Sequence, residues 1–310
     1  MKAVVTGGTG FIGSALVRHL YTHDHDIKVL GRRTGVSTNE SIKDIMSDIN
    51  ILDLDLQNYS QLCQQVRDAD VIYHLAAESH VAKSIENPEP FIKTNILGTM
   101  NILNAAMDMG VKNFVHISSC EVYGETDLNH LQSEDTSPLR PKSPYAASKG
   151  GADTLAQSYI STYGYPIVIV RPCNNYGPWQ HHEKVVPRFI RQFLRNANVT
   201  VHGEGGQERE WIYVEDCAEA IYRSTFITPG VYNIGTGSTC NINMLANMLK
   251  TCIPDSKSKI IYTTDREGQV KAFQLDGRKF AEATNWKAQT IFNKGIVQTI
   301  QWYRKYYGTQ

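Results

Sequence analysis

Three glycines near the N-terminus constrain the fold of this chain more than any other feature. Gly7, Gly10 and Gly13 follow the apolar run 3–5 and lead into an amphipathic stretch over 14–20. This succession predicts a β-strand, a tight turn and a helix with no intervening loop. Because glycine has no Cβ, such a turn lets the backbone approach an anion closely at the N-terminus of the helix. The spacing therefore predicts a dinucleotide-binding turn in a parallel α/β fold.

Short apolar runs separated by helical patterns continue through the first half of the chain. Strands of this kind are typical of a parallel sheet that is covered by helices on both faces. We therefore predict an α/β fold, a Rossmann-type doubly wound parallel sheet with a smaller, mixed α/β substrate-binding domain. The expected strands are 3–5, 27–30, 70–75, 114–117 and 167–170.

After residue 172 the pattern loosens into loops rich in Asn, Gly, Pro and His, with a helix expected near 185–196. Strand and helix character returns over 211–225 and 231–234. We expect residues 1–172 and 208–237 to form the NAD(P)-binding Rossmann domain. The remaining residues, 173–207 and 238–310, are expected to form a discontinuous substrate-binding domain.

The composition argues against several classes of function. The 31 Lys and Arg balance the 31 Asp and Glu, so no net charge favours nucleic acid or a membrane surface as a partner. The six cysteines lack C-x-x-C spacing, which argues against a zinc site or a disulfide framework and suits a reducing compartment. No apolar stretch approaches the roughly 18 residues of a membrane span, and the first residues do not resemble a signal peptide. We expect a cytoplasmic enzyme that uses no metal.

The residues that follow the second expected strand bear on the choice of dinucleotide. An acidic residue there binds the free 2′-hydroxyl of the adenosine ribose, but this chain has Gly31-Arg32-Arg33. Arginine fits a 2′-phosphate, so the sequence favours NADP over NAD, unless Arg32 and Arg33 are solvated residues of a surface loop. Asp55 and Leu56 are candidates to contact the adenine, although Asp55 can equally cap a helix. The turn residues expected to hold the dinucleotide are Gly7, Gly10, Phe11, Ile12 and Gly13.

A tyrosine and a lysine form the candidate catalytic pair. Tyr145 and Lys149 stand four residues apart at the start of a helical stretch, so they share one helix face. A lysine beside a phenol stabilises the phenolate, which lowers the tyrosine pKa and makes the phenol a usable base or acid. Alone, such a pair is usually a surface feature. Here Ser119, after the strand 114–117, supplies a hydroxyl that can share a substrate oxygen with Tyr145, and the glycine turn supplies the hydride acceptor.

With these residues in place, the chain resembles the extended short-chain dehydrogenase/reductases, and among them the nucleotide-sugar epimerases and dehydratases. The resemblance implies a homodimer, a nucleotide diphosphate-sugar substrate and oxidation at sugar C4 with Tyr145 as base. It also places Leu75, Ala76, Ala77 and Asn95 near the dinucleotide. The segments that carry it are TGGTGFIG (6–13), HLAAESHV (74–81), TNILGT (94–99), EVYG (121–124), SPYAASK (143–149), RPCNNYGP (171–178), WIYVED (211–216) and YNIG (232–235).

One segment separates the possible reactions. The chain is most similar to dTDP-glucose 4,6-dehydratases, which have Thr-Asp-Glu where this chain has Ser119-Cys120-Glu121. In those enzymes the Asp protonates the departing C6 hydroxyl and the Glu removes the C5 proton. Glu121 keeps the second role, whereas Cys120 replaces the acid. A thiol is protonated at neutral pH and can donate a proton, although weakly.

Two further interpretations of Cys120 stay open. The Ser-Cys-Glu segment is similar to that of the tunicamycin-pathway UDP-N-acetylglucosamine 5,6-dehydratase, which returns hydride to C4. Alternatively, Cys120 is a small buried residue at a strand end. For a C4 epimerase, Glu121 would be only a structural or binding residue.

Diphosphate recognition needs arginine forks and amide groups, and the later loops offer both. Asn175 and Arg209 are the preferred candidates by resemblance, and Ser84 is expected near the sugar. Arg266 lies in a segment like the family's Arg-Pro-Gly, with Glu267 in place of proline. The full set of expected substrate-binding residues is Ser84, Asn174, Asn175, Glu183, Lys184, Arg188, Arg209 and Arg266.

The sequence thus favours a nucleotide diphosphate-sugar dehydratase with NADP or NAD tightly bound and recycled. The expected roles are C4 base for Tyr145, pKa control for Lys149, orientation for Ser119, C5 base for Glu121 and candidate acid for Cys120. A UDP-sugar 4-epimerase or a UDP-glucuronate decarboxylase on the same scaffold is the alternative. A non-catalytic cofactor-binding subunit is the alternative from another class.

Overall fold

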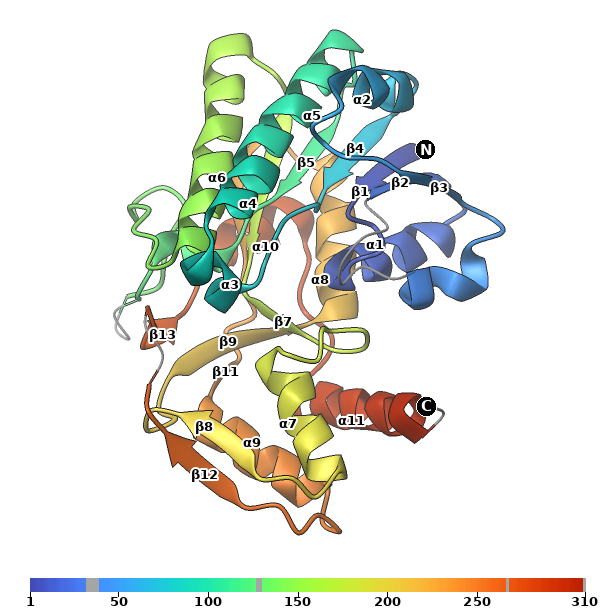
Figure 1. Ribbon diagram of the computed structural model, residues 1–310. Helices are drawn as coiled ribbons and strands as arrows, with labels where there is room; N and C mark the ends of the chain where they lie inside the picture. Colours follow the sequence, from blue (N-terminus) through green and yellow to red (C-terminus); the bar gives the residue numbers. More distant parts are fainter. Residues whose placement is uncertain (32–38, 127–129, 266–267, 309–310) are drawn as a thin grey trace.

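A seven-stranded parallel sheet forms the centre of the larger of two lobes (Figure 1). The computed structural model describes residues 1–31, 39–126, 130–265 and 268–308. The strand order is β10-β6-β5-β4-β1-β2-β3. Since this order reverses between β1 and β4, their carboxyl ends flank a crevice where ligands bind in such sheets. The strands are β1 (Lys2–Thr6), β2 (Asp26–Gly31), β3 (Asn50–Asp53), β4 (Val71–His74), β5 (Phe114–Ile117), β6 (Ile167–Pro172) and β10 (Gly230–Ile234).

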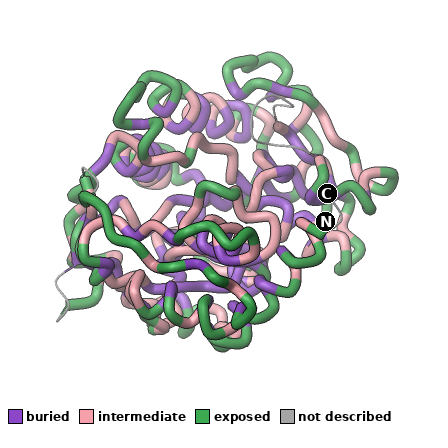
Figure 2. The backbone as a smooth tube through the Cα atoms, turned by 60° about the horizontal axis from the view of Figure 1, so that its bottom comes forward, coloured by how far each residue is buried: buried purple, intermediate pink, exposed green. Residues whose placement is uncertain are grey.

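Helices cover both faces of this sheet. In β1, Val5 packs in one core with Leu16 of α1, whereas Val4 packs in the opposite core with Leu62 and Ile102. Successive strand side chains point to opposite faces, so strands buried on both sides are apolar throughout. Figure 2 shows the buried backbone running through the interior, with exposed segments around it. The helices of the two faces are α1 (Phe11–Tyr21), α8 (Val214–Arg223) and α10 (Arg278–Thr284), and α2 (Tyr59–Val66), α5 (Gly98–Asp108) and α6 (Pro144–Tyr163).

Short helical segments join these elements. They lie mainly beside the carboxyl edge of the sheet, where the connections can vary without disturbing the core. They are η1 (Asn39–Ile45), α3 (Val81–Glu86), α4 (Glu89–Phe91), the π-helix η2 (Ile92–Leu97), and the 3₁₀ segments η3 (Cys120–Tyr123) and η4 (Ser224–Phe226).

Among the residues that the structure describes, the smaller lobe contains two small sheets and three helices (Figure 1). Its core is built from aromatic and aliphatic side chains such as Phe189, Phe193 and Leu249. One sheet holds β7 (Asn174–Tyr176), β9 (Glu208–Tyr213), β11 (Thr239–Asn241) and β13 (Ala272–Phe273). The other pairs β8 (Val199–His202) with β12 (Ile260–Thr263), and the helices are α7 (Val185–Leu194), α9 (Ile242–Cys252) and α11 (Phe292–Gly308).

The predicted fold class is confirmed, and each of the five expected strands is present in the central sheet. The division into domains stays a prediction. The chain crosses between the two lobes more often than the predicted domain boundaries allow. The sequence places 208–237 in the larger lobe, but β9 pairs with β7, β11 and β13 of the smaller lobe. Phe280 and Trp286, expected in the smaller lobe, are buried in the core beside α1. Within the described residues, no helix combines the length and apolarity needed to cross a membrane.

Candidate active site

The glycine turn has the geometry that its sequence predicts. The Gly7 N–H donates to the Leu30 carbonyl at 2.8 Å, and the Gly10 N–H donates to the Gly7 carbonyl at 2.9 Å. Gly7 has φ +69°, and a Cβ on it would lie 2.8 Å from backbone atoms of Ala76. A Cβ on Gly13 would collide with the Gly7 carbonyl oxygen. The turn therefore requires glycine at both positions.

This turn fits a dinucleotide pyrophosphate. Helix α1 begins at Phe11, and Gly10 before it makes no side-chain cap. The first N–H groups of a helix have no partner within it, so those of Phe11, Ile12 and Gly13 are oriented to receive an anion. The N–H groups of Leu75 and Ala76 donate to the carbonyl and hydroxyl oxygens of Thr6 at 3.2 Å each. The segment 75–77 thereby lies against the turn.

Other residues expected near the dinucleotide serve the protein's own structure. The Asn95 side chain accepts from the Glu78 N–H at 2.8 Å and donates to the Glu78 carbonyl and the Ser148 hydroxyl. It ties the loop after β4 to α6. Asp55 accepts from the Gln57 N–H at 2.9 Å in the turn before α2, whose N-cap is Asn58 and not Asp55, and Leu56 is buried in a core. Arg32 and Arg33 lie outside the described residues.

Tyr145 and Lys149 lie in the first turns of α6. The helix starts where Ser143 accepts from the Ala146 N–H at 3.1 Å and Pro144 occupies the first turn. The Tyr145 N–H donates to the Ser84 hydroxyl at 3.0 Å. The Lys149 ammonium donates to the Ile117 carbonyl at 2.5 Å, at the end of β5.

The pKa of Tyr145 is raised in this structure, and its expected lowering by Lys149 stays a prediction. Burial raises the pKa of Tyr145, the Glu121 carboxylate raises it further, and only a hydrogen bond with Ser119 lowers it. Lys149 contacts the Ile117 carbonyl instead, and burial lowers the pKa of its ammonium to about 8 against the opposing charge of Asp153. In this buried site, the free-energy cost of removing a charged group from water exceeds the gain from its interactions with neighbouring groups.

The segment 119–121 opens η3 directly after β5. The Ser119 hydroxyl accepts from the Glu121 N–H at 3.2 Å. Burial raises the pKa of Glu121, while the cations Lys184 and Arg209 lower it. Cys120 is 3% exposed and belongs to the large core. Burial first, and then Glu121, raise the pKa of its thiol, so Cys120 is protonated at neutral pH.

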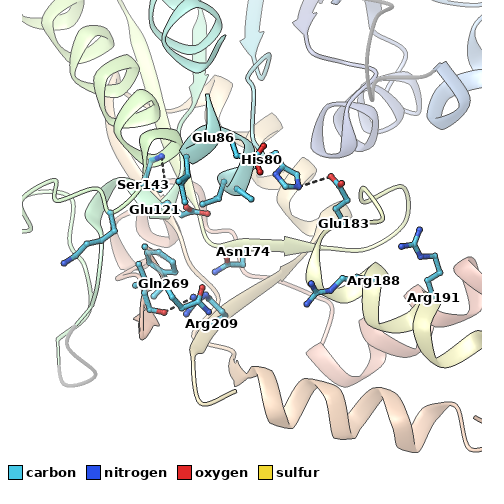
Figure 3. A pocket seen from close by; sticks show the side chains of 18 residues that line it. His80, Glu86, Glu121, Ser143, Asn174, Glu183, Arg188, Arg191, Arg209 and Gln269 are labelled. Atoms are coloured by element: carbon cyan, nitrogen blue, oxygen red, sulfur yellow. Dashed lines mark hydrogen bonds and ion pairs between the residues drawn. The ribbon is translucent and has the colours of Figure 1, made fainter. Parts of the chain in front are cut away.

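A cavity of about 650 Å³ opens between the lobes, with Glu121 in its wall (Figure 3). Five predicted residues line it: Glu121, Asn174, Glu183, Arg188 and Arg209. It also has lining residues that the sequence did not single out, among them His80, Lys142, Arg191 and Gln269. Arg191 stands three residues after Arg188 on α7, a helical spacing that could have revealed it.

Cationic groups of this cavity are held in fixed orientations. Arg209 donates to the carbonyls of Glu208 and Val270 at 2.8 Å each, and its guanidinium lies 4.9 Å from the Phe273 ring centroid. Arg188 donates to the Thr200 carbonyl at 3.3 Å. Such fixed guanidinium groups suit a diphosphate, because little side-chain entropy is lost on binding.

Two contacts join the lobes at the rim of the cavity. His80 Nε2 lies 2.8 Å from Glu183 Oε2, and the Lys184 ammonium donates to the Ser79 carbonyl at 2.9 Å. Burial would raise the pKa of Glu183, but the neighbouring His80 and His181 hold it lower. The two predicted residues 183 and 184 thus link α7 to the loop that follows β4.

Three expected substrate residues that the structure describes, Ser84, Asn175 and Lys184, are not among the residues that line the cavity. Ser84 is fully buried, and its hydroxyl donates to the Val81 carbonyl at 2.6 Å while accepting from Tyr145. Asn175 donates to the Cys173 carbonyl at 3.0 Å, while its neighbour Asn174 lines the cavity. Alternation along β7 separates the two. Arg266 lies outside the described residues.

Comparison with known proteins agrees with this geometry. The model of the NAD dependent epimerase/dehydratase family matches residues 3–235, and the chain belongs to this family. The family resemblance drawn from the sequence motifs is thereby confirmed. The low-salt glycan biosynthesis protein Agl12 of Haloferax volcanii is 37% identical over 98% of both chains. The dTDP-glucose 4,6-dehydratase 1 of Escherichia coli is 36% identical over 98% of this chain and 92% of its own.

The solved structures extend the comparison to the whole fold. A structure of the dTDP-glucose 4,6-dehydratase DesIV from Streptomyces venezuelae, with NAD bound, covers all of this chain with 98% of its own at TM-score 0.95 and 35% identity. The UDP-glucose 4-epimerase of Thermotoga maritima matches 99% of this chain and all of its own at TM-score 0.93 and 28% identity. The shared architecture spans both activities, so residues at the site must distinguish them.

Proposed function

We propose that this protein is an NAD(P)-dependent nucleotide diphosphate-sugar dehydratase of the 4,6 type. The observation that carries the proposal is the position of Glu121, which lines the cavity and is close enough to Tyr145 to raise its pKa. A C4 epimerase needs no carboxylate at this place, whereas dehydration needs a base at C5. Similarity to dTDP-glucose 4,6-dehydratases over nearly the whole chain supports the same conclusion.

The residues divide the chemistry between two elements. Tyr145, oriented by Ser119, takes the proton of the C4 hydroxyl, and the positive charge of Lys149 stabilises the phenolate that results. The bound dinucleotide supplies the hydride acceptor at C4 and later the donor. Glu121, whose pKa burial raises, removes the C5 proton that the C4 ketone has acidified. Arg188, Arg191 and Arg209 bind the diphosphate.

The loss of water can lead to two products, which differ in the carbon that receives the hydride. The protonated thiol of Cys120 can donate to the departing C6 hydroxyl, and hydride return to C6 would then give a 4-keto-6-deoxy sugar. Hydride return to C4 would instead give a 5,6-unsaturated sugar, the second candidate, which the cysteine in place of aspartate favours. Cys120→Asp is expected to increase the rate of water loss, because a carboxylic acid is the stronger proton donor.

The test is product analysis in deuterated water with a panel of dTDP-, UDP-, GDP- and CDP-hexoses. The proposal expects loss of one water, a C6 methyl group and deuterium at C5. A vinyl signal at C5–C6 indicates the 5,6 type. A product of unchanged mass that contains no deuterium indicates a 4-epimerase. Release of carbon dioxide from a UDP-uronic acid indicates a decarboxylase. Binding of dinucleotide without turnover of any sugar indicates a non-catalytic subunit.

Glu121→Gln is the matched variant. It should still oxidise C4 but should take up no deuterium at C5.

We further propose that NADP is preferred over NAD. Strand β2 ends at Gly31, which offers no carboxylate for a ribose 2′-hydroxyl, and Arg32 and Arg33 follow in the sequence. Solved relatives hold NAD, which supports the opposite preference. Calorimetric titration of both dinucleotides decides the matter. Arg32→Glu should weaken NADP binding while sparing NAD, and equal loss of both refutes the assignment.

The homodimer implied by the family resemblance is also part of this proposal. Analytical ultracentrifugation of the purified protein tests it directly. A mass of one chain across the concentrations used for assay would contradict it.

A further inference from the structure

Arg171, near the end of β6, joins two elements that carry different parts of the site. It is 2% exposed. Its Nε and Nη2 donate to the two carboxylate oxygens of Asp153 at 2.8 and 2.7 Å. Its Nη1 donates to the Tyr123 hydroxyl at 2.7 Å. One guanidinium therefore holds α6 through Asp153 and η3 through Tyr123.

On the α6 side, Asp153 lies one helical turn beyond Lys149 and two turns beyond Tyr145. Residues spaced by four share a helix face, so the ion pair fixes the face that presents the catalytic pair. Asp153 is fully buried, and its charge raises the pKa of Lys149 against the larger effect of burial. The Arg171–Asp153 contact therefore bears on both the position and the charge of Lys149.

On the η3 side, Tyr123 follows Glu121 by two residues in a single short helical turn. Its hydroxyl donates to Asn233 Oδ1 on β10 at 2.8 Å. Asn233 is itself fixed, because its amide donates to the Gln132 carbonyl at 2.8 Å and its N–H donates to Glu134 at 2.5 Å. A chain of buried polar contacts thus runs from β10 through Tyr123 and Arg171 to α6.

A buried ion pair is by itself weak evidence for stability. Replacing a buried ion pair by well-packed apolar residues is often neutral or stabilising. The planar fork of arginine, in contrast, fixes the direction of each partner. The network is therefore better explained by the geometry it imposes on the two elements.

We propose that Arg171 is a positioning residue that holds Glu121, the base for C5, in register with Tyr145 and Lys149, the pair that oxidises C4. The inference rests on the proposed dehydratase function. Oxidation at C4 needs Tyr145 and Lys149 on α6, the dinucleotide, and Ser119 at the junction of β5 and η3. Proton removal at C5 requires η3 to be held at the correct distance from the same sugar ring. Loosening the Tyr123 link is thus expected to affect the second step and spare the first.

The test compares Tyr123→Phe with Tyr165→Phe in the holoenzyme. Tyr165→Phe is the matched control, because it also removes a buried hydroxyl bond, to the Val111 carbonyl at 2.8 Å, in the opposite core. Single-turnover nicotinamide absorbance reports C4 oxidation, and solvent deuterium at C5 reports proton removal. Tyr123→Phe should slow deuterium uptake by roughly ten- to a hundredfold at an unchanged rate of C4 oxidation. Tyr165→Phe should change neither rate.

The possible outcomes separate the two proposals. Equal rates for wild type and Tyr123→Phe, or an equal loss in both steps, overturn the role of Arg171. Absence of turnover in the wild-type protein refutes the dehydratase assignment instead. If Tyr123→Phe does not fold, Arg171→Lys supplies a second comparison, since it keeps the charge and loses the fork. Because this change also loosens the contact with Asp153, it should slow both steps, with the larger loss in proton removal at C5. Arg171→Lys with both steps intact likewise overturns the inference.

Discussion

Replacing Lys149 with methionine should remove a defined part of the pH dependence of stability. Lys149 is buried, and burial lowers the pKa of its ammonium from 10.5 to about 8. At about 1.4 kcal/mol per pKa unit, the charged form costs about 3 kcal/mol in the folded, dinucleotide-free protein. The folded state holds fewer protons than the unfolded state between the two pKa values, so stability rises with pH across this window.

The size of the change follows from the two pKa values. Between pH 7 and pH 9.5, Lys149 should add about 2 kcal/mol to the free energy of unfolding of the wild-type protein, and Lys149→Met should lack this gain. The substitution also leaves the Ile117 carbonyl without its hydrogen-bond donor, because this carbonyl accepts from Lys149 at 2.5 Å. That loss shifts the stability of the variant at every pH, so only the difference between the two pH values isolates the charge.

Guanidinium unfolding of dinucleotide-stripped protein at several pH values measures the effect. Lys43→Met, at a side chain that is 73% exposed, is the control for the substitution itself. A stability difference between wild type and Lys149→Met that stays constant from pH 7 to pH 9.5 would refute the claim that burial lowers this pKa.

Three further predictions concern the site. Tyr145→Phe should reduce turnover by about 100- to 10,000-fold while the dinucleotide still binds, as measured by steady-state rates and calorimetry; near-normal turnover would remove Tyr145 from the mechanism. Gly13→Ala should abolish dinucleotide binding and destabilise the protein by about 1–3 kcal/mol, because its Cβ meets the Gly7 carbonyl; intact binding would contradict this. Arg209→Lys should raise KM about tenfold, or 1.4 kcal/mol, at unchanged kcat, since a lysine cannot replace the fork; a lower kcat alone would argue against a binding role.

Sequence reasoning succeeded where the responsible contacts are local. The strand, glycine turn and helix over 2–21 are contiguous, so spacing alone predicts their geometry. The i and i+4 positions of Tyr145 and Lys149 follow from helical periodicity in the same way. The fold class follows from apolar runs that are buried on both faces of a parallel sheet.

Contacts between residues far apart in the sequence determine the side-chain roles and pKa shifts that the sequence does not predict. Asn95 and Ser84 are expected beside the dinucleotide and the sugar, yet their side chains hold α6 and the loop after β4. The elevated pKa of Tyr145 depends on burial and on Glu121, which no spacing reveals.

The glycine turn, the pair on α6 and the family were thus determined by sequence alone, because each depends on neighbours within a few residues. Only the tertiary structure determines which side chains line the cavity and how the pKa values of the buried groups shift. It alone also shows that Arg171 links α6 to η3. Those properties depend on desolvation and on contacts between residues as far apart as Tyr123 and Asn233.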